Sequence, residues 1–399
     1  MSKSNETTPN VPTLRFPNYS GEWQVSPMGK VCTFCKGYGI SKDNLSSDGT
    51  PCILYGELYT TYKTAIAKSI KSKTSLDPTI LFHSQKNDVI IPCSGETAED
   101  IATSVCIPYD DILLGGDLTV IRSDLDGAFL SNQINSVRKY DIARIAQGKS
   151  IVHLQADELK KISIAYPTID EQQEISGFID KIDERIEVQN KIISKYETLI
   201  KGLYTQLQSK SAKKEYRICD IVKCHSVGLL SKENLTESGS KKCILYGELF
   251  TTYDEVINEI KSRTNVDGYI SQGNEILFPS STTVDAMSLI APSALNEKGV
   301  LLGGDMFVLE LLPGFNNEYI SYYFNTIAKR NIAKYAQGTT ITHLYFEHIK
   351  NVLLYLPDIT IQLSVASKMR KLKTKIRIEK EMLSALQKQK AFLLQSMFI

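Results

Sequence analysis

"CILYGELYTTY" occupies residues 52–62 and "CILYGELFTTY" occupies residues 243–253, so the chain carries nearly the same eleven residues twice, 191 positions apart. Chance does not supply ten matches in eleven, and three further stretches return at offsets of 188 to 190. They are "LLGGD" at 113–117 and 301–305, "AQGKSIVHL" at 146–154 against "AQGTTITHL" at 336–344, and "YPTIDEQQEI" from Tyr166 against "LPDITIQLSV" from Leu356. A near-constant offset of this length excludes a solenoid of short repeats. It predicts one long unit, a domain and the segment after it, present in two copies.

A long helix is predicted after each domain. Thr168 and Glu171 form a capping-box pattern behind Pro167, which marks a helix start. Apolar residues then alternate in steps of four and three, the spacing of a coiled-coil seam. The first seam is Ile175, Ile179, Ile182, Ile186, Gln189, Ile193, Tyr196, Ile200, Leu203 and Leu207. The second is Val365, Met369, Leu372, Ile376, Glu379, Leu383, Leu386, Lys390, Leu393 and Met397.

The two helices should pair with each other. Gln189 and Glu379 fall at the same step of the two seams, as residues that set the register do. Residues 168–210 hold 6 Lys/Arg and 8 Asp/Glu, whereas 358–399 hold 9 and 3, so opposite net charges favour pairing of the two. Because the order is domain, helix, domain, helix, the second helix must run back along the first. The pattern predicts an antiparallel coiled coil between two heads, related by an internal pseudo-two-fold.

The predicted boundaries are a first head at 1–167, a helix at 168–210, a second head at 211–357 and a helix at 358–399. Each head has the composition of a mixed α/β domain. The runs "ILLGGDLTVI" from Ile112 and "EILFPSS" from Glu275 are typical of strands. The stretch from Tyr319 has helical spacing and is predicted to end with Gly338 as its C-cap.

Composition excludes several protein classes. With 399 residues, 42% apolar and 23% charged, the chain can build two or three packed domains and is not a disordered protein. The first ten residues lack the pattern of a signal peptide, and no run approaches the ~20 apolar residues of a membrane span. We expect the eight cysteines to be reduced thiols in a cytoplasmic protein. Cys32 and Cys35 have the spacing of a metal or redox motif but no second pair follows, so no metal is expected.

No catalytic motif is recognisable. "QGKS" at 147–150 resembles the end of a phosphate-binding loop, but Ala143 stands where that loop needs glycine, and the second copy has Thr339 in place of the lysine. The repeated His153 and His343 are expected to hydrogen-bond within the fold. The chain is therefore predicted not to be an enzyme. Two similar but non-identical heads suit a DNA duplex, with each head at one half of a bipartite, asymmetric target.

These features together resemble the specificity subunits of type I restriction–modification systems. The resemblance covers nearly the whole chain: "LRFPNYSGEW" at 14–23, "GKSIVHL" leading to "YPTIDEQQEISGFIDKIDERI", and the weaker "GTTITHL" and "LPDITIQL" of the second copy. It implies two target-recognition domains and two long helices that dock with two modification subunits. Those subunits would bind S-adenosylmethionine and methylate adenine, and restriction subunits would use ATP and Mg²⁺ to translocate and cut DNA. The chain itself would hold no cofactor and would supply only the recognition of the DNA target.

The candidate DNA contacts are polar or aromatic residues on tight loops repeated in both heads. Hydroxyl groups can serve several bases, and Glu96 can accept a hydrogen bond from a cytosine amino group. The near-identity of the "YGEL" turns also fits a purely structural role. In the first head the candidates are Tyr59, Thr60, Thr61, Lys63, Ser94, Glu96, Thr97, Lys149 and Ser150. In the second head they are Phe250, Thr251, Thr252, Tyr253, Ser281, Thr282, Thr283, Thr339 and Thr340.

The charge of the heads departs from that of an ordinary DNA-binding protein. The first head has 17 Lys/Arg against 18 Asp/Glu and the second 14 against 16, within a chain of net charge +1. Because phosphate contacts supply most non-specific affinity, such heads should hold DNA weakly without partner subunits. This argues against the first alternative, a stand-alone two-headed DNA-binding regulator. The second alternative, a carbohydrate-binding or adhesion repeat, usually carries a secretory signal.

Overall fold

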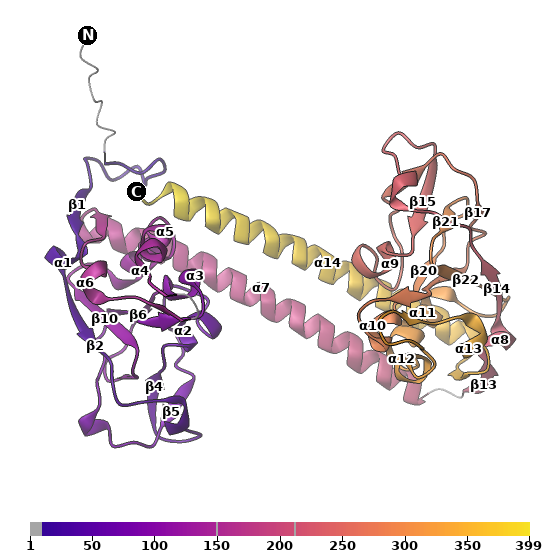
Figure 1. Ribbon diagram of the computed structural model, residues 1–399, viewed down its shortest axis with the longest axis horizontal. Coiled ribbons are helices and arrows are strands. Elements are labelled where there is room, and N and C mark those ends of the chain that lie inside the picture. The colour runs from indigo at the N-terminus through magenta and orange to yellow at the C-terminus, as the bar shows by residue number, and fades with distance from the viewer. Residues whose placement is uncertain (1–9, 149–150, 211–212) are drawn as a thin grey trace, which may run out of the picture. The chain divides into compact units, whose positions relative to one another are not determined.

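The computed structural model describes residues 10–148, 151–210 and 213–399, which form two compact units (Figure 1). The first unit comprises Met1–Ile193 and Glu379–Ile399, and the second comprises Ser194–Ile378. Two long helices, α7 (Ile169–Lys210) and α14 (Ile359–Ser396), each contribute one half to each unit. No helix in the described part of the chain is both long and apolar enough to span a bilayer.

The first unit is built on two four-stranded sheets, in the orders β2-β10-β6-β8 and β3-β5-β4-β9. Two small pairs, β1 with β12 and β7 with β11, complete its strands. The strands are β1 (Gln24–Pro27), β2 (Cys32–Lys36), β3 (Leu45–Ser46), β4 (Thr50–Ile53), β5 (Ser72–Thr74), β6 (Asp88–Pro92), β7 (Ser94–Gly95), β8 (Val105–Ile107), β9 (Leu113–Leu114), β10 (Leu118–Ser123), β11 (Val152–His153) and β12 (Ser163–Tyr166). The helices besides α7 and α14 are α1 (Met28–Val31), α2 (Glu57–Thr60), α3 (Ala98–Ile101), α4 (Gly127–Asn135), α5 (Lys139–Ile145) and α6 (Ala156–Leu159).

The second unit repeats this plan, with sheets β14-β22-β18-β20 and β16-β15-β21-β17 and pairs β13-β24 and β19-β23. Its strands are β13 (Lys214–Arg217), β14 (Val222–Ser226), β15 (Lys241–Leu245), β16 (Ser262–Thr264), β17 (Tyr269–Ile270), β18 (Glu275–Pro279), β19 (Ser281–Thr282), β20 (Ser293–Leu295), β21 (Leu301–Gly303), β22 (Met306–Leu311), β23 (Thr342–His343) and β24 (Leu353–Leu356). Its helices are α8 (Ile218–Ile221), α9 (Glu248–Thr251), α10 (Ala286–Leu289), α11 (Asn317–Thr326), α12 (Lys329–Ala333) and α13 (Phe346–Ile349). The predicted mixed α/β class and the internal duplication are confirmed.

The repeated eleven residues fold into the same strand and turn in both units. β4 pairs in parallel with β9, and β15 does so with β21. The glutamate of "YGEL" then fixes the turn, because its carboxylate accepts hydrogen bonds from two groups of the protein. For Glu57 the donors are the Leu54 amide and the Ser72 hydroxyl, both at 2.8 Å. Glu248 has the equivalent donors, the Leu245 amide at 2.8 Å and the Ser262 hydroxyl at 2.7 Å. The identity of this stretch is thus largely explained by scaffold hydrogen bonds.

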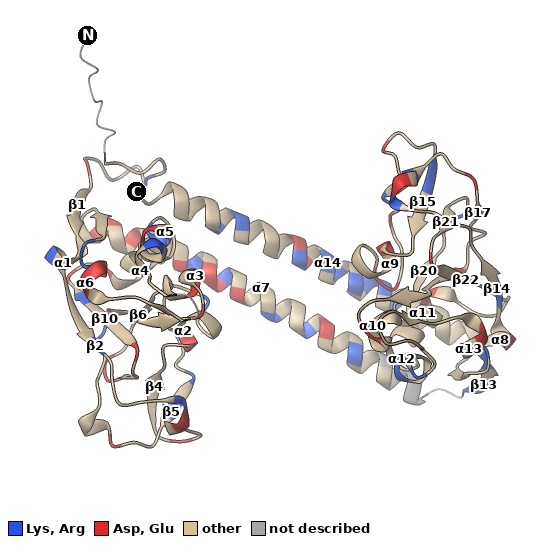
Figure 2. Ribbon diagram, viewed as in Figure 1, with Lys and Arg blue, Asp and Glu red and all other residues tan. Residues whose placement is uncertain are grey.

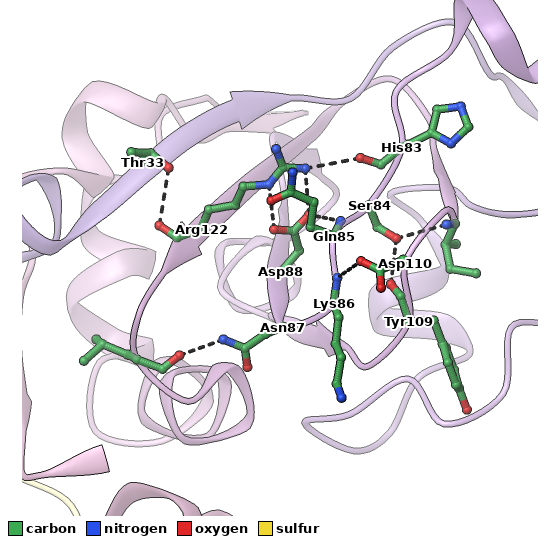
Figure 3. A network of polar contacts seen from close by, with 12 residues as sticks. Thr33, His83, Ser84, Gln85, Lys86, Asn87, Asp88, Tyr109, Asp110 and Arg122 are labelled. Atoms are coloured by element: carbon green, nitrogen blue, oxygen red, sulfur yellow. Dashed lines mark hydrogen bonds and ion pairs between the residues drawn. The ribbon is translucent and has the colours of Figure 1, made fainter.

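The cores show one clear difference between the units. In the first, buried Asp88 on β6 pairs with Arg122 on β10, with Arg122 Nε 2.8 Å from Asp88 Oδ1 (Figure 3). In the second unit Glu275 stands opposite Glu310 on the corresponding strands β18 and β22. Glu275 is fully buried and accepts from the Tyr269 hydroxyl at 2.9 Å. Burial raises the pKa of Glu275, and the Glu310 carboxylate adds a smaller effect in the same direction.

The two long helices pack antiparallel in both units. In the first unit Gln189 Nε2 donates to the Glu379 carbonyl at 3.0 Å and to its carboxylate, so the predicted polar pair of the seams is confirmed. Every described side chain of the two predicted seams is buried or half-buried; that of Leu207 lies outside the described set. Lys390 is accommodated in the seam because it forms an ion pair with buried Asp183, with Nζ 2.5 Å from Oδ1. In the second unit Lys375 lies over the Tyr196 ring.

Two local predictions differ from the structure. The prediction of one helix from Tyr319 to Gly338 is wrong, because the chain forms α11 and α12 with a break at Ile327 and Ala328. Gly338 is no C-cap: it lies five residues beyond α12 with φ +118 in a tight hairpin. Glu171, expected in a capping box, lies buried in an ion pair with Arg15, whose Nε is 2.7 Å away.

Candidate nucleic-acid interface

The predicted contact residues lie on three segments in each unit, and the first segment is the turn of α2 or α9. Thr60, Thr61, Thr251 and Thr252 are all exposed. The Thr60 hydroxyl donates to the Gly56 carbonyl at 2.7 Å, and Thr251 does the same to Gly247 at 3.2 Å. Their hydrogens thus point to the backbone, and each oxygen also hydrogen-bonds the hydroxyl of the next threonine, at 3.4 and 3.3 Å. One lone pair of each oxygen is left to accept from a base amino group.

The aromatic members of this segment differ between the units. Tyr59 and Tyr253 are half-buried, and Phe250 is 37% exposed. Burial raises the pKa of both tyrosines, that of Tyr253 to about 12, so both keep their phenolic proton at neutral pH and can donate it. Lys63 is exposed and its Nζ lies 3.1 Å from the Tyr59 carbonyl.

The second segment is the loop that leaves β7 or β19 and enters a one-turn helix. Ser94 and Ser281 are buried, and the Ser94 hydroxyl donates to Asp117 at 3.2 Å, so these two serines support the loop. Glu96 and Thr283 are exposed, and Thr282 is half-buried. Thr97 caps α3 by accepting from the Asp100 amide at 3.1 Å. The exposed members of the second segment are therefore Glu96 and Thr97 in the first unit and Thr283 in the second.

The third segment is a hairpin that begins at the repeated "AQG". Gln147 and His153 exchange two backbone hydrogen bonds, at 2.9 and 2.8 Å, and Gln337 and His343 do so at 2.9 and 2.7 Å. Gly338 needs its positive φ here, because a Cβ would meet the Ile341 carbonyl oxygen at 2.0 Å. Thr339 and Thr340 lie exposed at the tip. Lys149 and Ser150, their counterparts, lie outside the described residues.

The three segments of a unit lie next to one another. β7 pairs with β11 and β19 with β23, which joins the second segment to the third. In the first unit Tyr59 is close enough to Glu96 and Asp100 for their charges to raise its pKa further, after the larger effect of burial. In the second unit Phe250, Tyr253 and Thr282 line one open hollow of about 490 Å³. The structure thus gathers most of the predicted residues of each unit into a single surface.

A basic helix that was not among the predicted site residues leads into each hairpin. α5 carries Lys139 and Arg144, and the corresponding α12 carries Lys329 and Arg330 with Lys334 directly after it. Arg144 is 81% exposed, and these helices contact α3 and α10 of the second segment. A signal was present, since a cationic stretch precedes "AQG" in both copies. Such cations at the edge of the surface can meet phosphates. Figure 2 also shows a run of blue residues along the part of α14 that belongs to the second unit.

No metal centre emerges from the described residues. Within residues 10–148, 151–210 and 213–399, no three His, Cys, Asp or Glu side chains are placed to share a metal ion. Cys32 is buried on β2, where burial raises its pKa to about 11, and Cys35 is half-buried one position before the strand ends at Lys36. The surface offers hydrogen-bonding groups, aromatic rings and cations, which suits recognition of a polyanion better than chemistry upon it.

Comparison with known proteins bears on what this surface recognises. The sequence matches the type I restriction modification DNA specificity domain twice, over residues 20–198 and 210–388. The fold is similar to the crystal structure of a type I restriction–modification system S subunit from M. genitalium, with a TM-score of 0.67 at 16% identity, covering 98% of this chain and 99% of that one. It is also similar to a chain from a study of complex assembly and conformational transition of the type I R-M system, with a TM-score of 0.52 at 14% identity, covering 93% and 96%.

Proposed function

This chain belongs to the family of type I restriction–modification DNA specificity domains, carries two of them, and is a DNA target-recognition subunit; we propose that each unit reads one half of a bipartite, asymmetric target. The observation that carries the proposal is the three-segment surface, which occurs once in each unit on the same scaffold. Equivalent scaffolds present equivalent loops to DNA, and different side chains on those loops select different bases.

The cations of α5 and α12 would position each unit on the phosphate backbone. Phosphate contacts fix the orientation of a reader but carry no sequence information directly. Lys139, Arg144, Lys329, Arg330 and Lys334 flank the hairpins, whereas the hairpin tip itself carries hydroxyl groups in the second unit. We therefore assign backbone contacts to the two helices and base contacts to the loop tips.

The two long helices would set the distance between the units and hold the partner subunits. Several apolar side chains lie outside the seam with substantial exposure, among them Val188, Met382 and Phe392 in the first unit and Leu199 and Leu363 in the second. An apolar side chain on the outer face of a helix in a two-helix pair is suited to a further helix. We assign these faces to two modification subunits, which would bring S-adenosylmethionine and the adenine chemistry, while restriction subunits would bring ATP and Mg²⁺.

In this scheme the chain works in the cytoplasm, where the DNA is, and performs no catalysis alone. The test is reconstitution of the full chain with its modification subunit, S-adenosylmethionine and a random DNA pool, followed by mapping of the methylated adenines. We expect a two-part motif with a fixed spacer. Exchange of residues 1–165 for the same segment of another family member should change one half of the motif and preserve the other. A change in both halves at once would contradict independent readers.

The same preparation tests the assignment of roles. Arg144→Ala and Lys334→Ala should weaken DNA binding about equally for all sequences and reduce its dependence on salt by about one phosphate contact each. Lys232→Ala, on the short 3-10 turn Lys232–Asn234 away from the three segments, serves as the matched control for lost charge. If the alanine variants altered the methylated sequence and left the salt dependence unchanged, the cations would be base readers and the assignment would fail.

A further inference from the structure

The two units differ most at one point of this surface, the tip of the loop between β7 and α3 or between β19 and α10. Both loops leave a two-residue strand and end at a capping residue, Thr97 in the first unit and Asp285 in the second. Between strand and cap the first unit has one residue, Glu96, and the second has two, Thr283 and Val284. A single acid in one unit is thus replaced by a hydroxyl and an isopropyl group in the other.

The tip side chains of both units are exposed. Glu96 is exposed and forms no ion pair with any described residue, so its carboxylate is open to a hydrogen-bond donor. Val284 is 73% exposed, although its backbone is held: its amide donates to the Thr282 hydroxyl at 3.3 Å, and Asp285 caps α10 by accepting from the Ser288 amide at 2.7 Å. Because these hydrogen bonds hold Val284 in an exposed position, its apolar surface is available to a ligand.

The surroundings of Val284 are apolar as well. Val284 lines the open hollow together with Phe250 and Tyr253, and Met287 on the next turn is 40% exposed. In the major groove of DNA the apolar group on a base edge is the 5-methyl of thymine, whereas cytosine presents an amino donor at the neighbouring position. The acid of the first unit and the valine of the second therefore match different pyrimidines.

On the basis of the proposed function, we propose that this loop tip determines specificity, so that Val284 contacts a thymine methyl in the second half-site and Glu96 accepts from a cytosine amino group in the first. The loop differs in length by one residue between the units, while the strand before it and the helix after it keep their places. The tip can therefore change chemistry without disturbing the three-segment surface around it.

The experiment uses the reconstituted complex of full chain and modification subunit on duplexes that contain the mapped target. Each thymine of the second half-site is replaced in turn by deoxyuridine, which removes only the methyl group. For the wild-type chain one replacement should lower affinity about four-fold, the equivalent of one buried methyl group. For Val284→Ala the same replacement should have almost no effect. Leu353→Ala, at a 45% exposed position on β24, is the control and should keep the wild-type response.

Glu96→Gln tests the other unit. It should relax the preference for cytosine at one position of the first half-site, because an amide can both donate and accept. It should also raise affinity for all sequences, because a negative charge near phosphates is lost. Deoxyuridine that has no effect at any thymine, or an equal effect in wild type and Val284→Ala, would overturn the proposal for the second unit. Unchanged base preference in Glu96→Gln would overturn it for the first, and failure to find any bipartite motif would instead refute the proposed function.

Discussion

Replacement of Phe398 by alanine should destabilise the first unit strongly, although Phe398 is the second residue from the C-terminus. α14 ends at Ser396, and the chain continues into the core of the first unit. There the Phe398 ring is 2% exposed, with its centroid 5.0 Å from that of Phe129. Backbone hydrogen bonds hold this end in place, since the Leu14 amide donates to the Ser396 carbonyl at 2.9 Å.

The expected loss in the free energy of unfolding follows from the burial of the Phe398 ring. Truncation of a fully buried phenylalanine to alanine costs about 3–5 kcal/mol through lost apolar contact and the cavity left behind. We expect the lower value, about 3 kcal/mol, if the neighbouring side chains of the cluster partly collapse into the space. For a unit of this size that corresponds to a fall of roughly 6–12 °C in Tm. Such a loss is a large share of the ~5–15 kcal/mol that holds a typical domain together.

The assay follows from the single tryptophan of the chain, Trp23, which is 2% exposed and belongs to the same cluster, 5.6 Å from the Phe129 ring. Its fluorescence during urea titration therefore reports unfolding of the first unit and not of the second. Phe392→Ala, which truncates a 63% exposed phenylalanine on α14, is the matched control and should change stability by less than about 0.5 kcal/mol. Equal midpoints for the two variants would refute the packing argument.

Three further predictions test other parts of the chain. Lys390→Met should destabilise the first unit by about 3–5 kcal/mol, because buried Asp183 would lose its ion-pair partner, and the additional change Asp183→Leu should restore much of this stability. Glu275→Gln should make the second unit less sensitive to pH. Burial raises the pKa of Glu275 above its ordinary 4.5, so the folded state retains this proton more strongly and the wild type loses stability as pH rises above about 4.5. Four helical residues inserted after Leu207, before the second head at 211–357, add ~6 Å, which should lengthen the spacer of the methylated motif by at most about two base pairs.

Each of these has a result that would count against it. Lys390→Met that is no less stable than the double variant would mean that solvent reaches Asp183. For Glu275→Gln the measurement is the unfolding transition that circular dichroism records and Trp23 does not, between pH 4 and 8, with exposed Glu237→Gln as control. The same pH dependence in all three proteins would assign it to other groups. An insertion that changed a half-site and kept the spacer would show that the helices do not set the distance.

The duplication and the pairing of the two long helices could be predicted because the sequence patterns that encode them are repeated or periodic. Ten seam positions in each helix fix which face is buried, and Gln189 opposite Glu379 fixes the register. The topology of the units was not readable, since their strands are two to six residues long and pair over long distances, as Cys52 does with Leu113. A period of two cannot be recognised in a strand such as β9, Leu113–Leu114.

The error at Tyr319–Gly338 has a local cause. The apolar spacing of that stretch is helical throughout, but the Ala328 amide bonds to the Tyr323 carbonyl five residues back, and α12 begins after it. The chain must then close the hairpin between Gln337 and His343, which uses the positive φ of Gly338. The local pattern had assigned Gly338 to a helix end, but the structure uses its positive φ to close this hairpin.

Comparison of the two units explains why some repeated residues persisted while others changed. Glu57 and Glu248 each accept from the same two donors, so a change in either copy would leave half-buried polar groups without these partners. Glu96 has no such partner among the described residues, so its replacement by Thr283 and Val284, with an insertion of one residue, costs the fold little. Two units that recognise different half-sites can differ in sequence only where a replacement costs little folding stability. The exposed loop tips satisfy that condition, and the hydrogen-bonded turn that first revealed the duplication does not.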